Sequence, residues 1–376
     1  MKLQRYAATA GAGLLAVATL AACGTNNNTP ASSTTSASGG ASASPTASVA
    51  CATGTLNLAG STAQQNAIDK FAIDFQNNCS GSTINYNGNG SGAGLTSFEN
   101  KQVDFAGSDY PLNSSNQSGA NAACASGGPA IDLPMVPGLI SVMYNVTGVT
   151  KSINLKASTI AKIFEGAITN WNSAEIAAEN PGVTFPSLPI TTVHRSDTSG
   201  TSFNFSNFLN STDPTDFPQA ANKQWPGQGG EGESGSSGVA QTVSTTPGAI
   251  GYAELSYANA DKLQVANVGN ADNQYVPINA TNAANFFDQA QVTATGDDLQ
   301  LQFNYKYAAK DAYPAVLVTY EIVCGAGNNA TQLTLVKDFL TYMDSASEQS
   351  QLPGLGYVEL PTAIQTKVAA SIASMK

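Results

Sequence analysis

The sequence predicts an α/β fold built on a parallel sheet, and three observations support this class. Segments typical of strands and helices alternate as β-α-β-α-β between residues 55 and 108, the pattern of parallel strands joined by helices. Three of the expected strand-to-helix junctions are rich in Gly, Ser and Thr. About 325 residues follow Cys51, which is enough for two domains of ordinary size.

The first expected unit is a strand followed by a helix. TLNLAG at 55–60 alternates as a strand does, and Ser61 and Thr62 behind it are suitable N-caps. The apolar residues that follow recur at helical spacing on one face: Ile68, Phe71, Ala72 and Phe75.

The remaining elements follow in the same manner. Strands are expected at 83–88, 103–108, 190–196, 248–254 and 315–323, and helices at 95–102, 157–171, 201–209 and 331–343. The long apolar segment 131–146 contains two prolines and an aspartate. Buried strands are therefore a better interpretation of this segment than a membrane span.

The first 22 residues have the features of a secretory leader. Lys2 and Arg5 precede an apolar stretch that ends in LAAC, and the stretch is too short for a membrane span. LAAC resembles a bacterial lipobox, which predicts a lipoprotein acylated at Cys23, with palmitate among the acyl chains; an ordinary leader is the alternative. Residues 24–50 have no charged or aromatic side chain, so 23–51 is expected to be a flexible tether.

Charge limits the possible partners. Without Lys2 and Arg5, 13 basic residues stand against 26 acidic ones, a balance that argues against a nucleic-acid partner. An acidic protein that binds an anion cannot rely on long-range attraction. It needs a local, pre-organised site.

Four cysteines remain besides Cys23: Cys51, Cys79, Cys124 and Cys324. An even number in an exported protein predicts two disulfides. Three connectivities are open, and we favour Cys51–Cys79 with Cys124–Cys324. The cysteine spacing matches no zinc motif and the chain has a single histidine, so no metal and no cofactor are expected.

Three junctions are candidate anion sites: AGSTA at 59–63, GNGSGAG at 88–94 and RSDTSGT at 195–201. A helix N-terminus has backbone N–H groups without partners and a partial positive charge, so it binds anions readily. In an open parallel sheet such junctions lie at the carboxyl ends of the strands, where ligands bind. Each signal alone is also typical of a plain helix cap or turn.

The stretch HRSDTSGT at 194–201 favours binding over catalysis. His194 and Arg195 alternate along one strand, so their side chains point to opposite faces, and His194 is expected to be structural. The chain has no G-x-S-x-G and no P-loop motif. The planar fork of Arg195 suits a tetrahedral oxyanion, and Asp197 is placed to orient it; a plain Arg–Asp surface pair is the alternative.

Several segments together resemble one family. They are 59–63, 86–112, 166–186, 193–209, 224–235, 245–258 and 312–323, and they are similar, in the same order, to landmarks of the phosphate-binding protein of bacterial phosphate-specific ABC transporters. The resemblance covers nearly all of residues 54–376. It implies a type II periplasmic-binding-protein fold with the ligand in a cleft between two α/β lobes.

The resemblance also implies lobe boundaries and ligand contacts. Lobe I would be 52–136 and 317–376, lobe II would be 137–316, and the chain would cross between them near Val136 and near 315–318. The implied phosphate contacts are Thr62, the backbone of Ala63, Ser91, Asp109, Arg195, Ser199, Gly200 and Thr201, with Asp197 orienting the arginine. Two positions depart from the family pattern: a bulkier residue usually stands at Ala63 and a glycine commonly at Thr198.

Asp109 suggests how such a site would select its ligand. A carboxylate repels a bare anion strongly in a dry site, but it accepts a hydrogen bond from an anion that carries a proton. Monohydrogen phosphate has that proton and sulfate does not. Asp109 is therefore expected to reject sulfate.

The family resemblance implies a setting as well. The ligand would be inorganic phosphate, the partners the permease and ATPase subunits of an ABC transporter, and the protein a lipid-anchored monomer at the extracytoplasmic face of the cell membrane. No enzymatic activity is expected. The alternatives are a site for another oxyanion such as arsenate or for a phosphorylated metabolite, a secreted phosphatase using Ser199 or Thr201, and an adhesin on the same fold.

Overall fold

The computed structural model describes residues 51–376 apart from Asn273. The predicted leader, the lipid site at Cys23 and tether residues 24–50 lie outside the described residues and stay predictions. No helix within the described part of the chain is both long and apolar enough to cross a membrane.

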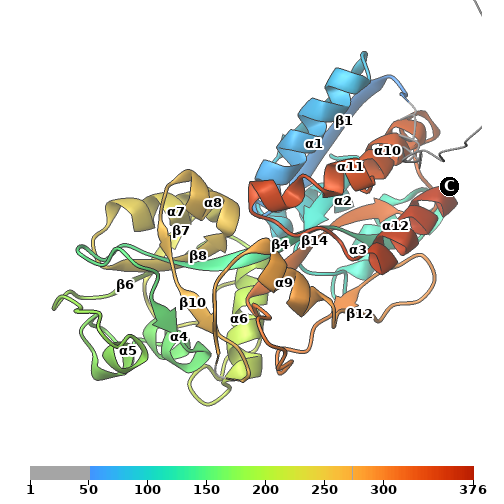
Figure 1. Cartoon of the computed structure of the whole chain (residues 1–376). Coiled ribbons are helices and arrows are strands. Elements are labelled where there is room, and N and C mark those ends of the chain that lie inside the picture. The colour runs from blue at the N-terminus through green and yellow to red at the C-terminus, as the bar shows by residue number, and fades with distance from the viewer. Residues whose placement is uncertain (1–50, 273) are drawn as a thin grey trace, which may run out of the picture. The chain divides into compact units, whose positions relative to one another are not determined.

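The described residues form an alternating series of strands and helices (Figure 1). The strands are β1 Gly54–Gly60, β2 Ser82–Asn87, β3 Phe105–Ser108, β4 Ala130–Tyr144, β5 Asn154–Leu155, β6 Thr191–Arg195, β7 Glu231–Glu233, β8 Ala249–Glu254, β9 Gln264–Val265, β10 Asn267–Gly269, β11 Tyr275–Val276, β12 Gln291–Val292, β13 Leu301–Gln302 and β14 Val316–Cys324. The α-helices are α1 Gln65–Asn78, α2 Ser91–Glu99, α3 Gln117–Ala123, α4 Ala157–Phe164, α5 Ala174–Glu179, α6 Gly200–Thr212, α7 Gly235–Thr245, α8 Leu255–Ala260, α9 Ala280–Phe287, α10 Ala330–Met343, α11 Ala346–Gln349 and α12 Thr362–Ser374, with short 3₁₀ turns at Ala125–Gly127 and Leu352–Leu355.

One sheet carries most of the strands, in the order β2-β1-β3-β14-β4-β8-β6-β7, with β9 also paired to β4. The pairs β1–β2, β1–β3, β6–β7 and β6–β8 are parallel, which confirms the predicted α/β class. β14 and β4 are antiparallel and lie in the middle of this order (Figure 1).

The strand directions bring two groups of strand ends together, those of β1 and β3 and those of β6 and β8. β1 and β3 run in the direction of β4, whereas β6 and β8 run against it. β3 lies level with the N-terminal part of β4, with β14 between the two strands, and β8 pairs with the C-terminal part of β4. The carboxyl ends of the two groups therefore face each other along β4, and the helices that follow begin there.

The apolar segment 131–146 is confirmed as strand, and it forms one continuous element. All 15 residues of β4 are buried, between β14 and the short β9 on one side and β8 on the other. Pro134 and Pro137 lie within the ladder to β14, whose register shifts between Thr319 and Tyr320. Such an irregularity is where a strand tolerates proline, which has no N–H to donate.

Three predicted helix boundaries were wrong. α1 begins only at Gln65, with Gln64 as its N-cap, so Ser61 and Thr62 form a turn in front of the helix. The predicted helix 157–171 ends as α4 at Phe164, because Gly166 takes a φ of +74° that stops it. α2 begins at Ser91 rather than at 95.

Aromatic packing fixes the helices on the sheet. Phe75 of α1 contacts Phe339 and Tyr342 of α10 edge-on, with ring centroids 5.3 and 5.4 Å apart. Phe205 of α6 stacks on Tyr252 of β8 at 4.4 Å. Each buried ring contributes about 1.5–3 kcal/mol, so the N-terminus of α6 is held rigidly beside β6 and β8.

Both favoured disulfides are present, and the prediction of this pairing is confirmed. Cys51 is bonded to Cys79, and Cys124 to Cys324, 200 positions further along the chain. The second bond ties the segment before β4 to the end of β14.

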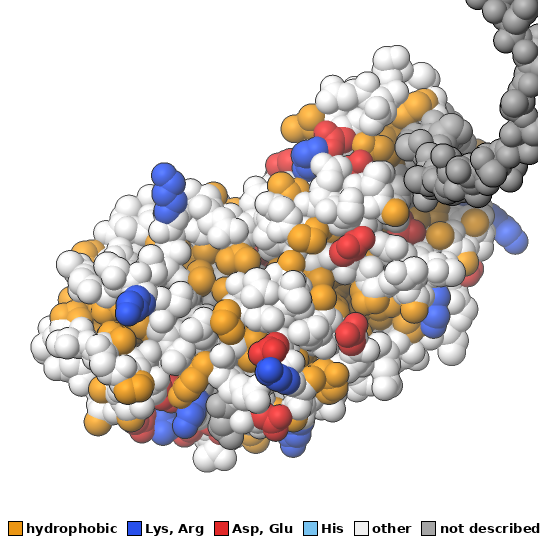
Figure 2. All heavy atoms as spheres, in the orientation of Figure 1, with side chains coloured by type: hydrophobic (Ala, Val, Ile, Leu, Met, Phe, Trp, Pro, Cys, Tyr) orange, Lys and Arg blue, Asp and Glu red, His pale blue; other side chains and the backbone are white. Residues whose placement is uncertain are grey.

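Charged residues are sparse in this chain, at 11% of the sequence. On the face drawn in Figure 2, the basic side chains of the described residues are scattered, and several lie next to acidic ones. An anion would gain little from this face, in line with the expectation of a local site.

Candidate functional site

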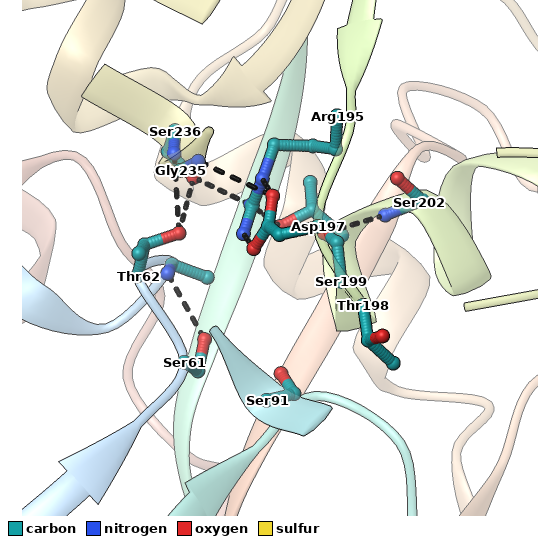
Figure 3. A network of polar contacts seen from close by, with 12 residues as sticks. Ser61, Thr62, Ser91, Arg195, Asp197, Thr198, Ser199, Ser202, Gly235 and Ser236 are labelled. Atoms are coloured by element: carbon teal, nitrogen blue, oxygen red, sulfur yellow. Dashed lines mark hydrogen bonds and ion pairs between the residues drawn. The ribbon is translucent and has the colours of Figure 1, made fainter. Parts of the chain in front are cut away.

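The three predicted junctions meet at the facing strand ends. The turn after β1, the start of α2 and the segment from β6 into α6 lie around one group of buried polar side chains (Figure 3). The N-terminus of α7 joins them, since the hydroxyl oxygens of Thr62 and Ser236 are 2.9 Å apart.

Arg195 is the central cation of this group. It ends β6 and is only 2% exposed. Its Nε donates to Oδ1 of Asp197 at 2.7 Å, and its Nη2 donates to Oδ2 of the same carboxylate (Figure 3). The geometry is the predicted one, with Asp197 fixing the plane of the guanidinium through a bidentate pair.

The ion pair determines the charge of both partners. Burial works against the charged form of Arg195, but hydrogen bonds and charge from Asp197 outweigh it and raise the pKa of the guanidinium. Burial likewise acts to raise the pKa of Asp197, but Arg195 outweighs it and lowers that pKa. Both groups are therefore charged at neutral pH.

The edge of the guanidinium away from Asp197 faces hydroxyl groups. Nη1 donates to Thr201 Oγ1 at 3.4 Å and to Ser236 Oγ at 3.2 Å. The Ser236 N–H in turn donates to Thr62 Oγ1 at 3.2 Å. These neighbours are hydroxyls, which can rotate, rather than a second carboxylate, so a bound oxyanion can compete with them for the N–H groups of this edge.

The N-terminus of α6 supplies further donors. Ser199 caps the helix, with its Oγ accepting from the Ser202 N–H at 3.2 Å. Within residues 51–376, position 273 aside, no acceptor is hydrogen-bonded to the N–H of Gly200 or Thr201. A helix end with free N–H groups beside a guanidinium is well suited to an oxyanion.

Gly200 makes the contact between the two groups of strand ends possible. A Cβ at this position would lie 2.4 Å from Cβ of Asp109 and 2.7 Å from Oγ of Ser91. Only a glycine lets the start of α6 approach these residues so closely. The structure thus brings Ser91, Asp109, Gly200 and Arg195 to one place, and their contact with a ligand stays a prediction.

Asp109 supplies the acceptor side. It is 3% exposed, accepts from Thr319 Oγ1 at 2.7 Å and from Ser91 Oγ at 3.2 Å, and its own N–H donates to Ser91 Oγ. Burial raises the pKa of its carboxyl, an effect opposed by the hydroxyls of Ser61, Thr319 and Ser91 and by the charge of Arg195.

Ala63 looks different from the prediction in the structure, whereas His194 lies as predicted. The Ala63 N–H donates to Ser61 Oγ at 2.9 Å, so it has a partner already, and its contact with a ligand stays a prediction. His194 points away from Arg195: its ring stacks on Trp225, with centroids 5.9 Å apart, and its Nδ1 lies 3.0 Å from the Arg195 carbonyl oxygen. Its place agrees with a structural role.

Sequence reasoning missed Ser236, Thr319 and Glu254. Ser236 stands in the run SGSSG at 234–238, the same small-residue signal that marked the other junctions. Thr319 is a polar residue inside a buried apolar strand. Glu254 ends β8 with no surface exposure, and its Oε1 accepts from Thr201 Oγ1 at 2.9 Å.

The donors present fit an anion rather than a metal. Among the described residues, no group of three His, Cys, Asp or Glu side chains is arranged to hold a metal ion. The arrangement offers a fixed cation, helix N–H groups and hydroxyls on one side, and a carboxylate acceptor on the other.

Known proteins share this architecture. A PBP superfamily domain matches residues 45–347. Phosphate-binding protein PstS 3 of Mycobacterium tuberculosis is 38% identical over 376 residues, 99% of each chain. PstS 2 of the same species is 39% identical over 369 residues, covering 96% of this chain and 97% of the relative.

Solved structures confirm the type II periplasmic-binding-protein fold. A periplasmic phosphate-binding protein bound with phosphate at pH 8.5 has a TM-score of 0.69 at 23% identity, over 84% of this chain and 93% of that one. A phosphate-binding protein from Stenotrophomonas maltophilia has a TM-score of 0.65 at 18% identity, with the same coverage. With its fold, its site and its full-length relatives in agreement, the chain belongs to the PBP superfamily and, within it, to the PstS family of phosphate-binding proteins.

Proposed function

We propose that the protein binds inorganic phosphate outside the cytoplasm and delivers it to the membrane permease of an ABC transporter for import. The observation that carries the proposal is the pairing of a buried arginine with a buried carboxyl across one helix N-terminus. Arg195 is held by Asp197, and Asp109 lies against Gly200 at the start of α6. The relatives named phosphate-binding proteins support it.

The donors around the site match a tetrahedral oxyanion. We assign the contacts to Thr62, Ala63 N–H, Ser91, Asp109, Arg195, Ser199, Gly200 and Thr201, with Asp197 as the orienting group, and add Ser236. Micromolar affinity requires about 8 kcal/mol. Charge-assisted hydrogen bonds contribute about 1.5–3 kcal/mol each, so a handful of them is sufficient after desolvation costs.

Selection against sulfate follows from Asp109. Its carboxylate accepts from Thr319 and Ser91 and can accept one more hydrogen bond. Monohydrogen phosphate donates that bond. Sulfate would place an unprotonated oxygen against a carboxylate in a site sheltered from water, where repulsion is strong.

Ligand entry requires the two groups of strand ends to separate. Arg195 and Asp109 are 2% and 3% exposed, and hydrogen bonds join the groups, among them Gly92 N–H to the Thr198 carbonyl at 3.0 Å and Tyr257 OH to the Thr62 carbonyl at 2.7 Å. We propose lobes of 52–136 with 317–376 and of 137–316, hinged where β4 and β14 pass between them.

To deliver phosphate, the protein must stay at the membrane and still be able to contact the permease. We propose that Cys23 carries the lipid and that residues 24–50 are the tether of a monomer on the extracytoplasmic face of the cell membrane. More than one acyl chain is needed for stable anchoring. Import energy would come from the ATPase subunits of the transporter.

Calorimetric titration of the purified protein with phosphate and sulfate tests the proposal. We expect one saturable phosphate site and at least tenfold weaker sulfate binding. Absence of phosphate binding, or equal affinity for both ions, would refute it. Competition by arsenate, and turnover of a chromogenic phosphate ester, distinguish the other oxyanion and the phosphatase alternatives.

A further inference from the structure

A second buried carboxyl, that of Glu254, lies at the site next to a proposed phosphate contact. Its Oε1 accepts from Thr201 Oγ1 at 2.9 Å, and its Oε2 is buried without a hydrogen-bond partner among the described residues. Thr201 also accepts from Arg195 Nη1 at 3.4 Å. One hydroxyl therefore connects the carboxyl of Glu254 to the cation of the site.

The proton of Glu254 decides where the Thr201 hydroxyl points. A threonine hydroxyl has one hydrogen to donate and two lone pairs. An ionised Glu254 can only accept, so it takes the Thr201 hydrogen. A neutral Glu254 donates to Thr201 Oγ1 across the same contact. Arg195 occupies the second lone pair, and the Thr201 hydrogen is released toward the anion site.

We propose that Glu254 is a positioning residue whose proton determines whether Thr201 donates to the bound anion. Phosphate binding is then strongest while Glu254 is neutral and weakens as it ionises, since ionisation removes one donor and adds a negative charge. This inference rests on the proposed function, because it concerns the same phosphate site.

The surroundings of Glu254 allow it to change its charge near neutral pH. Burial and the charge of Asp109 raise its pKa to about 7, against the opposing effects of the Ser236 hydroxyl and of Arg195. Tyr257 of α8 and Tyr357 lie close enough to Glu254 that its charge adds to burial in raising the pKa of both phenols. The neutral form prevails below this pKa, so phosphate affinity should fall as pH rises through it.

The main test measures phosphate affinity by calorimetry at pH 6 and pH 8.5 in the intact protein and in Glu254→Gln. A glutamine amide donates to Thr201 at both pH values, as the neutral acid does. The loss of affinity between the two pH values should be about tenfold larger in the unmodified protein than in Glu254→Gln. Phosphate's own titration is common to both proteins and cancels.

Asp344→Asn is the matched control. Burial raises the pKa of Asp344 to about 7 as well, but Asp344 makes no hydrogen bond to a site residue within the described part of the chain. Its variant should keep the pH dependence of the unmodified protein. An equal flattening in Asp344→Asn would overturn the role of Glu254.

A second pair of variants decides the matter if Glu254→Gln does not fold. Thr201→Val should reduce phosphate affinity about tenfold at pH 6 and much less at pH 8.5, where the hydroxyl already points to Glu254. Thr201→Ser should restore the behaviour of the unmodified protein. A Thr201→Val loss that is equal at both pH values would overturn the inference.

These measurements also distinguish failure of the role proposed for Glu254 from failure of the proposed phosphate binding. If the unmodified protein binds no phosphate at either pH, the proposed function fails. If it binds phosphate and its pH dependence matches that of Glu254→Gln, the inference fails and the function stands.

Discussion

Arg195 and Asp109 are buried to the same degree at one site, yet their charges are compensated in different ways. On the donor side, Arg195 is matched by a full opposite charge on Asp197, in a bidentate pair. On the acceptor side, Asp109 is surrounded by hydroxyls: those of Thr319 and Ser91 donate to its carboxylate, and that of Ser61 also lowers its pKa. The donor side is pre-organised, whereas the acceptor side retains a carboxyl whose charge and bonding can respond to a ligand.

The difference has a consequence for what each side can do. A guanidinium neutralised by its own carboxylate attracts anions weakly at long range, but its edge away from Asp197 is held in a plane that suits an oxyanion. A carboxyl held by hydroxyls carries no built-in cation, so it penalises a ligand that lacks a proton. We therefore expect the donor side to supply most of the affinity for phosphate, and the acceptor side to discriminate against unprotonated anions such as sulfate.

Loss of Arg195 should have the largest effect. Arg195→Ala removes at least two charge-assisted hydrogen bonds of about 1.5–3 kcal/mol each, so phosphate affinity should fall at least a hundredfold. Arg195→Lys keeps the charge but not the fork, and should recover only part of the loss. Calorimetric titration measures both variants, and an unaltered affinity in Arg195→Ala would remove the arginine from the site.

Glu321 shows what happens to a carboxyl without hydroxyl partners. It lies two positions after Thr319 on β14, and neither carboxylate oxygen has a hydrogen-bond partner among the described residues. Burial raises its pKa from an ordinary 4.5 to about 8. The folded protein therefore holds this proton more readily than the unfolded chain, and the free energy of unfolding should fall as pH rises from about 4.5 to about 8.

Glu321→Gln should flatten this dependence. Relative to the unmodified protein, the variant should gain up to about 5 kcal/mol between pH 4 and pH 9, because the pKa of Glu321 rises from 4.5 to about 8 and each unit corresponds to about 1.4 kcal/mol. Urea unfolding across that range provides the measurement, with Glu359→Gln on the surface as control. Parallel stability curves would show that Glu321 is not held neutral.

Asp109→Asn should change selectivity more than affinity. The amide cannot accept the ligand's proton as strongly, but it no longer repels an unprotonated oxygen. The ratio of phosphate to sulfate affinity should drop about tenfold. Asp104→Asn, whose carboxylate accepts from the Asn57 N–H outside the site, should leave the ratio unchanged. If the ratio is also constant in Asp109→Asn, discrimination lies elsewhere.

The parts of the site that local sequence encodes were predictable. A strand followed by glycines and hydroxyl residues indicates a helix N-terminus, and it identified the stretches containing Thr62, Ser91 and Arg195. Partners that are distant in the sequence were not predictable. Thr62 is hydrogen-bonded to Ser236, 174 positions away, and Asp109 to Thr319, 210 positions away. No short-range pattern encodes such contacts, because they arise from the order of strands in the sheet.

The wrong boundaries have a related cause. Ser61 and Thr62 are typical helix-cap residues, but neither side chain caps α1. Ser61 Oγ accepts locally from the Ala63 N–H, and Thr62 bonds to the distant Ser236. Their residue types predict a place at the start of the helix. In the structure they lie in a turn in front of it, where Thr62 joins the site. Functional sites are where such local rules are most often overridden.

The smallest effect is expected at Thr319, and it tests the acceptor side most directly. Its hydroxyl donates to Asp109 Oδ1 at 2.7 Å and so lowers the pKa that burial raises. Thr319→Val should raise the pKa of Asp109 further, so that discrimination against sulfate is lost at a higher pH than in the unmodified protein, with a change of a few-fold near the transition. Thr319→Ser retains the hydroxyl and should follow the unmodified curve. The phosphate-to-sulfate ratio measured from pH 4 to pH 8 decides this, since superimposed curves for all three proteins would mean that the hydroxyls around Asp109 do not control its charge.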